Sequence, residues 1–289
     1  MKLPLLGYGC GLRIPHYPHL LSGAPTRVDW FEIIVESFTD WSDGTRLRSR
    51  EVLEAIRKNH PVVAHGVSLS LGSTAGVDRA HLLRVKQLLE EFEISWFSDH
   101  VCWTGAAGTS THDLLPLPYT QEAVRTVSEN IARAQDVLGQ RILIENLSSY
   151  VTFRHSEMTE WEFLSEVVQR ADCGLLLDIN NVFVSSRNHR FDPWDYLNGV
   201  PAERVGQIHL AGHYDAGTHL VDTHSEPVCD EVWELYESYT HQHGPRSTLI
   251  EWDDNLPEFS RVEQEVERAR EKAEVPHAHP DTRSTPAHV

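Results

Sequence analysis

The sequence has few cysteines, no long apolar run and a deficit of positive charge, and each shortage excludes a class of protein. Only four cysteines occur in 289 residues, and no two form a C-x-x-C pair. This usage fits reduced thiols in a cytoplasm better than a disulfide framework or a thiolate metal site. No apolar run approaches the ~20 residues of a membrane-spanning helix. The first seven residues, MKLPLLG, are too short and too interrupted for a secretory signal. We therefore expect a cytoplasmic protein with no membrane association.

Positive charge is also scarce. Lysine and arginine number 25 against 43 acidic residues, which gives a formal net charge of -18, and no basic cluster offsets it. Such a chain repels phosphate backbones, so we expect no nucleic-acid partner. The hydrophobic content of 40% is ample for one large core. We predict a single domain over residues 1–273, followed by a disordered tail over 274–289 that is rich in Pro, His, Thr and Ser.

Short apolar runs alternate with amphipathic stretches, which is the order typical of repeated βα units. The apolar runs predict eight strands at residues 7–13, 30–35, 62–67, 95–98, 141–145, 174–178, 205–210 and 248–251. Helical periodicity covers 46–58, 82–92, 124–138, 161–171 and 232–241, and Thr159 with Glu162 forms a capping-box pattern before the fourth of these helices. The expected fold is an α/β (β/α)8 TIM barrel.

The chain is rich in histidine, with 18 residues, and several stand where predicted strands end. Six consecutive strands each deliver an imidazole or a carboxylate at the end where barrel enzymes place their active sites: His65, His100, Glu145, Asp178, His209 and Glu251. Any one of them is easily explained as a hydrogen-bonded rim residue. Six in register would repel one another or stay unsatisfied without a cation, so the pattern favours a cluster of zinc, iron or manganese ions.

The loop after the seventh strand adds further donors. Asp222 and His224 alternate as in an extended segment, so both can face one ion. His213 and His219 fit a supporting or substrate-contacting role as well as a structural one. Three acidic residues are candidates to orient ligating histidines: Glu32, Glu36 and Asp99. Residues 103–118 are expected to form a loop over the barrel mouth, either an ordinary barrel loop or one that grips substrate.

The segments that surround these residues resemble the DUF692 or UPF0276 family of multinuclear non-haem iron-dependent oxidative enzymes, which is similar to the methanobactin biosynthesis oxidases. The resemblance covers nearly the whole chain and rests on the segments GCGLR (9–13), HGVSLS (65–70), SDHVCW (98–103), HDLLPLP (112–118), DINN (178–181), HLAGH (209–213) and EWDD (251–254). It implies a TIM barrel of the xylose isomerase type, related in fold to endonuclease IV.

The resemblance also implies a ligand set. His65, His100 and Glu145 would hold one ion, and Glu145 would bridge to a second ion held by Asp178, His209 and Glu251. Glu145, Asp178 and His209 would carry the catalytic roles. A third ion would use Asp222, His224 and Asn181, which stands where endonuclease IV carries a histidine. An amide is a weaker ligand than imidazole, so we expect the third site to be the loosest, and this departure counts against phosphodiester hydrolysis.

The activity that the resemblance implies is oxidation of a side chain, cysteine foremost, in a ribosomally synthesised precursor peptide. It would use two to three iron ions, with dioxygen as co-substrate. The predicted barrel leaves no separate domain to grip a leader sequence, so we expect a small partner protein that recognises it. The residues alone leave two alternatives open. These are a divalent-metal hydrolase or sugar isomerase on the same barrel, and a metal-storing scaffold without turnover.

Overall fold

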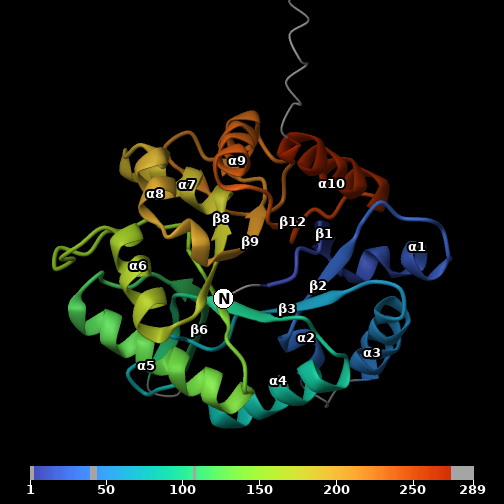
Figure 1. Cartoon of the computed structure of the whole chain (residues 1–289), viewed down its shortest axis with the longest axis horizontal. Coiled ribbons are helices and arrows are strands. Elements are labelled where there is room, and N and C mark those ends of the chain that lie inside the picture. The colour runs from blue at the N-terminus through green and yellow to red at the C-terminus, as the bar shows by residue number, and fades with distance from the viewer. Residues whose placement is uncertain (1–2, 40–43, 107–108, 275–289) are drawn as a thin grey trace, which may run out of the picture.

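The computed structural model describes residues 3–39, 44–106 and 109–274, and eight of its strands form a closed parallel barrel (Figure 1). The strands follow one another around the barrel in chain order, and β1 pairs with β12 to close it. They are β1 (Tyr8–Gly11), β2 (Trp30–Ile34), β3 (Val62–Gly66), β4 (Phe97–His100), β7 (Leu143–Glu145), β8 (Gly174–Asp178), β9 (Val205–Leu210) and β12 (Ser247–Ile250). The predicted TIM barrel is confirmed. The predicted tail lies outside the described residues, apart from Glu274.

Helices surround the barrel, and most of them follow a strand (Figure 1). Thr159 and Glu162 form the predicted capping box of α6, and Gly139 ends α5 with a φ of 76°, a left-handed conformation that glycine adopts freely. None of the described helices is long and apolar enough to cross a bilayer. The helices are α1 (Tyr17–Leu21), α2 (Glu36–Thr39), α3 (Gly44–Arg57), α4 (Arg79–Glu91), α5 (Gln121–Leu138), α6 (Glu160–Ala171), α7 (Ile179–His189), α8 (Pro193–Gly199), α9 (Asp230–His243) and α10 (Phe259–Ala273), with the short 3-10 turns η1 (Ile14–His16) and η2 (Ala202–Arg204).

The barrel interior changes from apolar to polar along its axis. Successive side chains of a strand point to opposite faces, so every second residue points inward. The inward-facing residues nearer the strand starts form one apolar cluster: Trp30, Val63, Trp96, Leu143, Leu176 and Leu249. Two positions further along each of five of these strands stand polar residues: Glu32, His65, Ser98, Glu145 and Asp178. The apolar layer closes one end of the barrel and leaves the polar groups at the other.

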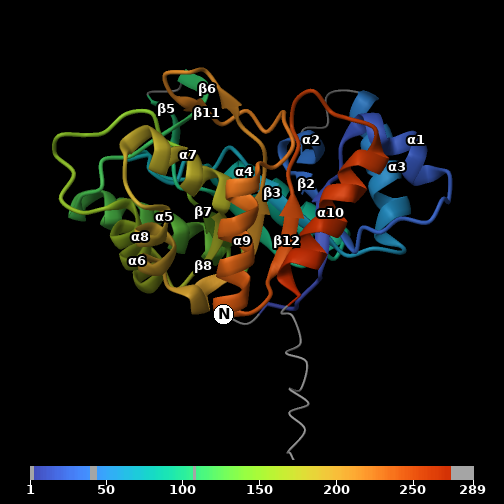
Figure 2. The ribbon, with the colours of Figure 1, turned by 90° about the horizontal axis from the view of Figure 1, so that it is seen from above.

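Two hairpins stand at the polar end (Figure 2). Residues 103–118, predicted as a loop, instead contain the antiparallel strands β5 (Trp103–Ala106) and β6 (Thr109–Leu115). The loop after β9 contains a second, shorter hairpin of β10 (Tyr214–Asp215) and β11 (Leu220–Val221). The glycines and prolines of the first segment had indicated a loop, and the threonine-rich stretch between them supplies the second strand.

Candidate metal centre

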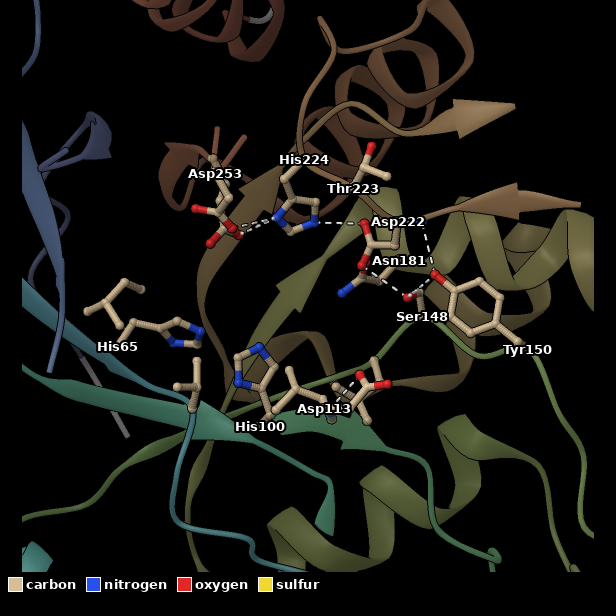
Figure 3. Close-up of a pocket in the computed structure, with 15 residues that line it drawn as sticks. His65, His100, Asp113, Ser148, Tyr150, Asn181, Asp222, Thr223, His224 and Asp253 are labelled. Atoms are coloured by element: carbon tan, nitrogen blue, oxygen red, sulfur yellow. Dashed lines mark hydrogen bonds and ion pairs between the residues drawn. The ribbon is translucent and has the colours of Figure 1, made fainter. Parts of the chain in front are cut away.

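A cavity of about 260 Å³ opens at the polar end of the barrel, and side chains from the strand ends converge on it (Figure 3). The six residues predicted at these ends fall into two groups of ligand-type atoms, each within 4.8 Å of one another. The first group is His65, His100 and Glu145, and the second is Glu145, Asp178, His209 and Glu251. Glu145 belongs to both groups, so one carboxylate lies between two potential ion positions.

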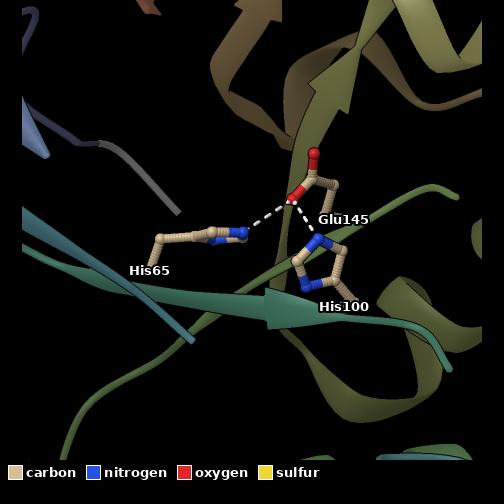
Figure 4. Close-up of side chains that lie close together, drawn as sticks. All are labelled: His65, His100 and Glu145. Carbon is tan, nitrogen blue, oxygen red and sulfur yellow. Dashed lines mark ion pairs between the residues drawn. The ribbon is translucent and has the colours of Figure 1, made fainter. Parts of the chain in front are cut away.

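The first group is a pair of imidazoles directed at one carboxylate oxygen (Figure 4). Nε2 of His65 lies 3.1 Å and Nε2 of His100 lies 3.2 Å from Oε2 of Glu145. The three side chains come from β3, β4 and β7, which are neighbours in the barrel. Because these strands pair in register, His100 stands directly beside Glu145, and the three donor atoms meet without any loop to position them.

In His65 and His100 the ring nitrogen Nδ1, which points away from Glu145, is held by a contact to an oxygen. This contact leaves Nε2 facing the cavity. Nδ1 of His100 lies 3.1 Å from the carbonyl of Gly66, and Nδ1 of His65 lies 2.8 Å from the hydroxyl of Ser98, which itself donates to a backbone carbonyl. An oxygen that accepts requires N–H on Nδ1, so each Nε2 carries a lone pair. In the neutral rings these two lone pairs would be directed at a carboxylate oxygen and would repel it, so a proton or a metal ion must stand between them. Metal-ligating histidines are oriented in this way.

The second group is centred on His209. Its Nδ1 lies 2.9 Å from Oε2 of Glu251 and 3.4 Å from Oε1 of Glu145. Its other nitrogen, Nε2, faces Glu32 at 3.3 Å and the amide of Gln207 at 2.7 Å. Glu32 thus has the orienting role predicted for it. It contacts Nε2 of His209, so that Nδ1 on the opposite side of the ring is directed toward the carboxylates of Glu145 and Glu251.

Asp178 joins this group while it also begins a helix. One of its oxygens, Oδ1, accepts a hydrogen bond from the backbone N–H of Asn181 at 2.6 Å and caps α7. The other, Oδ2, is buried and has no hydrogen-bond partner. Asn146 holds the Asp178 backbone with two hydrogen bonds of 2.9 Å. The strand-to-helix junction therefore fixes the carboxylate and leaves one oxygen for a ligand.

A third group lies nearer the surface, around His224 (Figure 3). Nε2 of His224 lies 2.8 Å from Asp222, the residue expected to share an ion with it, while Nδ1 lies 3.3 Å from Asp253 and 3.4 Å from Glu251. The ligand-type atoms that lie within 4.8 Å of one another belong to His224, Glu251 and Asp253. Asn181 lines the same cavity, and since its Nδ2 donates to a backbone carbonyl, its Oδ1 is left as a free acceptor.

The buried atoms of the donor groups that have no hydrogen-bond partner show whether these groups fit a metal ion. Several buried atoms that line or face the cavity lie close to one another but have no hydrogen bond of acceptable geometry: Glu145 Oε2, Asp178 Oδ2, Asn181 Oδ1, His209 Nδ1 and His224 Nε2. Buried polar atoms without partners are costly. All five atoms are oxygen or imidazole nitrogen, the donors that suit iron, zinc and manganese. The residues therefore fit a multinuclear metal centre.

The pKa directions show how the cluster compensates its charge without a metal. Burial alone would raise the pKa of Glu145, yet the histidines around it, His100 first, lower it well below its usual value. Burial would lower the pKa of His65, but Glu145 raises it to about 9. Burial raises the pKa of Asp178 well above its usual value. Burial would likewise lower the pKa of His209, but its carboxylate neighbours raise it well above its usual value, whereas burial lowers the pKa of His100. Protons on His65 and His209 therefore compensate the charge of the metal-free cluster, and a metal ion would replace them.

Four residues considered in the sequence contact other groups. Glu36 accepts from the backbone of Val67 at 3.1 Å and lies 3.8 Å from His81, and Asp99 accepts from the backbone N–H of His100 at 2.7 Å, so neither is hydrogen-bonded to an imidazole of the donor groups. His213 contacts Asn180, which in turn donates to Asp222 at 2.9 Å, so this contact fits the supporting role considered for it. His219 is exposed and contacts Thr218 and the ring of Tyr150. None of the four belongs to the donor groups found among the described residues.

Other residues of the site were missed. Arg13, just past β1, pairs with Asp253 at 2.5 Å and approaches Glu251 at 3.8 Å, so a fixed cation faces the third group. Ser98 orients His65. Arg13 and Asp253 lie two and three residues past the ends of barrel strands, which was a usable signal. Ser98 lies two residues before His100 on the same strand, so both point inward. A serine gives no indication of the group that it will contact.

Comparison with known proteins adds the following. The family model of the RiPP precursor modification enzymes MbnB/TglH/ChrH matches residues 7–274. A UPF0276 protein of Anaeromyxobacter sp. is 54% identical over 92% of this chain and 93% of its own length. A UPF0276 protein of Caulobacter vibrioides is 48% identical, over 92% and 94%.

Solved structures resemble the chain in fold only. A D-tagatose 3-epimerase-like protein aligns with a TM-score of 0.61 at 14% identity, covering 92% of this chain and 98% of its own. Endonuclease IV from Thermus thermophilus aligns with a TM-score of 0.57 at 15% identity, over 93% and 100%. At such identities the likeness shows a shared barrel and says nothing about the reaction.

Proposed function

The chain belongs to the family of RiPP precursor modification enzymes MbnB/TglH/ChrH, and from this membership we propose that it is a multinuclear non-haem iron oxidase. Its substrate would be a ribosomally synthesised precursor peptide, of which it oxidises a side chain, cysteine foremost, with dioxygen as co-substrate. The observation that carries the proposal is the pair of buried donor groups that share Glu145. A mixed imidazole and carboxylate set without thiolate suits redox-active iron and leaves room for external ligands.

The proposed ligands follow from the geometry. His65, His100 and Glu145 would hold one iron, and Glu145 with Asp178, His209 and Glu251 would hold the second. A third would bind near the surface, where the donors are Asn181, Asp222 and His224, with Asp253 added by the structure. When bound, the irons supply one-electron chemistry with dioxygen that no side chain can perform.

The protein's own residues position the metals and the substrate. Glu145, Asp178 and His209 act as the central ligands and fix the relative position of the two inner ions. The orienting contacts of Ser98, Gly66 and Glu32 keep the histidine lone pairs directed inward. Polar and charged side chains line much of the cavity, among them Asp113, Ser148 and Tyr150, so a small polar group such as a thiol can enter. A narrow site of this kind holds one side chain in place.

Recognition of the rest of the precursor would need a partner. The described barrel carries no added domain for a leader peptide, and the net charge of -18 favours a basic partner or leader. We propose that a small partner protein binds the leader and delivers the core peptide to the mouth. We also place the complex in the cytoplasm, where the four free cysteines would stay reduced.

Co-expression tests this function. The enzyme, the candidate partner and the precursor peptide encoded beside the gene are produced together, and the peptide is analysed by mass spectrometry. We expect a mass change that needs iron and dioxygen and that is weak without the partner. An unchanged peptide, together with metal-dependent sugar isomerisation or phosphodiester cleavage by the same protein, would instead support a hydrolase or isomerase.

A further inference from the structure

A second cavity lies beside the metal cavity and differs from it in character. Its volume is about 230 Å³, and its lining is mostly apolar, including Leu117, Tyr119, Val151, Phe153, Met158 and Trp161. It lies between the segment that follows the β5–β6 hairpin and the loop that joins β7 to α6. Both of these segments belong to the polar end of the barrel, where the metal cavity opens.

One short segment forms a wall of both cavities. Leu147, Ser148 and Tyr150 line the metal cavity, whereas Ser149, Val151 and Phe153 line the apolar one. From Ser148 to Val151 the residues alternate between the two sides, as they do in an extended segment. The wall between the two cavities is this single segment. An extended substrate peptide advances about 3.3 Å per residue, so a peptide that crosses the segment can reach both cavities within a few residues.

The rim of the apolar cavity exposes an unusual amount of hydrophobic surface. Tyr150, Val151 and Phe153 are all exposed and adjacent, whereas Leu5, Leu21 and Leu83 are exposed at scattered positions of the chain. Single exposed apolar residues are normal, but a cluster beside a cavity indicates a binding site. The cluster lies on the segment that also carries Ser148 to the metal cavity.

The polar groups of this cavity are engaged with one another. Nε2 of His189 lies 2.7 Å from the hydroxyl of Ser149, and the carboxyl of Glu160 is hydrogen-bonded to Tyr119 and Tyr196. Burial raises the pKa of Glu160 to about 7 in spite of these bonds, which is the behaviour of a carboxyl in apolar surroundings. The cavity therefore offers apolar contact with little free charge.

We propose that this apolar cavity binds an apolar or aromatic side chain of the substrate peptide while the residue to be modified enters the metal cavity. The inference rests on the proposed function, because it takes a peptide as the substrate. The shared wall favours the peptide over a partner protein as the occupant, since the same short chain must reach the metals. The volume lies below the roughly 300 Å³ at which small-molecule pockets begin, and so suits one side chain.

The contact would also explain how a polar metal site holds its substrate. The metal cavity is lined by charged groups as well as by apolar ones and is small, so additional binding energy must come from elsewhere on the peptide. Burial of one aromatic side chain corresponds to roughly tenfold or more in affinity. Peptides with a large apolar residue near the modified position should therefore bind better than those without one.

Photo-crosslinking and binding with defined peptides test the inference on the full-length protein. The probes are blocked hexapeptides in which serine replaces the reactive cysteine, with benzoylphenylalanine one, two or three residues away. We expect crosslinks within residues 149–161 for one spacing. In anisotropy titrations, phenylalanine peptides should bind about tenfold better than the matched aspartate peptides.

A matched pair of variants locates the effect. Val151→Asp places a carboxylate at the rim and should reduce binding of the phenylalanine peptide about tenfold, while Leu83→Asp, at a residue of similar exposure (48% against 56%) on α4, should not. Equal loss in both variants, or crosslinks only at residues that do not line the apolar cavity, would overturn the inference. Crosslinks from the partner protein in place of the peptide would overturn it as well.

The binding test is independent of oxidation. Cysteine peptides that are oxidised with no preference for a neighbouring apolar residue would refute the apolar cavity's role and leave the proposed function intact. Peptides that bind through this cavity but are never oxidised by the iron-loaded complex would support the cavity and refute the oxidase.

Discussion

The two donor groups that share Glu145 are the inner groups of the cavity, and the group around His224 is the outer one. They differ in burial, in the elements that carry the ligands and in how their charge is compensated. The side chains of the inner groups are almost fully buried, with Glu145 1% and His209 0% exposed, whereas His224 is 13% and Asp253 43% exposed. The inner ligands stand on barrel strands, while Asp222 and His224 stand on a loop after the β10–β11 hairpin. The outer group also faces a permanent cation, Arg13, which the first inner group lacks.

With metals bound as proposed, this difference would give two kinds of site in one cavity. The inner ligands are fixed by strand register and by contacts to their outer nitrogens, so the metal-free protein already has their geometry. Asp253 is already engaged by Arg13 and by Nδ1 of His224, so a metal there must compete. We expect tightly held inner ions and an exchangeable outer one.

The largest effect should come from Glu145→Gln. One carboxylate serves both inner groups, so its loss disrupts two sites, and we expect activity to fall about a thousandfold or more with the fold retained. Metal content, turnover and circular dichroism measure this. Glu265→Gln, at a buried glutamate on α10, is the control and should keep its metals. Near-normal metal content in Glu145→Gln would mean that Glu145 is not a metal ligand.

Metal removal should separate the two kinds of site. Protein purified without oxygen should carry two to three transition-metal ions per chain, with iron prominent. During anaerobic dialysis against a chelator, the outer ion should leave first and the inner pair later, because the outer donors are more exposed. Elemental analysis over time follows the loss. Simultaneous loss of all ions would remove the distinction between inner and outer groups.

Ser98→Ala should weaken the inner site without removing a ligand. The hydroxyl of Ser98 orients His65, and loss of such an outer contact reduces metal affinity about 10-fold. Competitive metal titration measures the change. Ser128→Ala, at a buried serine of α5 whose hydroxyl has no partner, is the matched control. Equal metal affinity in both variants would mean that packing alone holds His65 in place.

Asn181→His should strengthen the outer site. The free Oδ1 of Asn181 lines the cavity, and imidazole is a better ligand than amide for a transition metal. We expect the third ion to be retained several-fold longer during dialysis, while Asn181→Ala should lose it faster. If both variants behave like the natural protein, Asn181 does not contact the outer ion.

A buried carboxyl away from the donor groups, Glu160, should affect the pH dependence of stability and leave metal binding unchanged. Glu160 lacks the histidines that surround Glu145, and burial raises its pKa to about 7 from 4.5. The native state then binds more protons than the unfolded state between these pH values, so the free energy of unfolding falls as pH rises from 4.5 to 7. Relative to Glu160→Gln, the natural protein should lose roughly 2 kcal/mol between pH 5 and 8. Parallel denaturation curves at both pH values would contradict this.

The strands could be predicted from the sequence because each is a short apolar run with a defined end. Residues 174–178 and 205–210 form strands with the predicted bounds, whereas the fourth strand begins at Phe97, two residues later than predicted. Helix α7 was missed because it follows β8 without a connecting loop, so the apolar pattern of strand and helix runs together. Its capping residue is Asp178, whose role as a ligand candidate hid its role as a helix cap.

The convergence of the site was predictable for the same reason, since parallel strands bring their ends together. What the sequence could not show was the orientation of individual side chains. Arg13 is the last residue of one predicted strand and Asp253 lies two residues past another, but only the folded chain shows that they face Glu251 and His224. The alternation of residues 148–151 between two cavities likewise depends on a loop path that carries no periodic signal.

The central claim is that one buried carboxylate, Glu145, lies between two metal ions. Anomalous diffraction at the iron edge, from crystals grown without oxygen, tests it directly. The account predicts two strong peaks about 3.5–4 Å apart on either side of Glu145, one beside His65 and His100 and the other beside Asp178 and His209, with a weaker peak near His224. A single peak, or peaks that leave Glu145 without a metal contact, would contradict it.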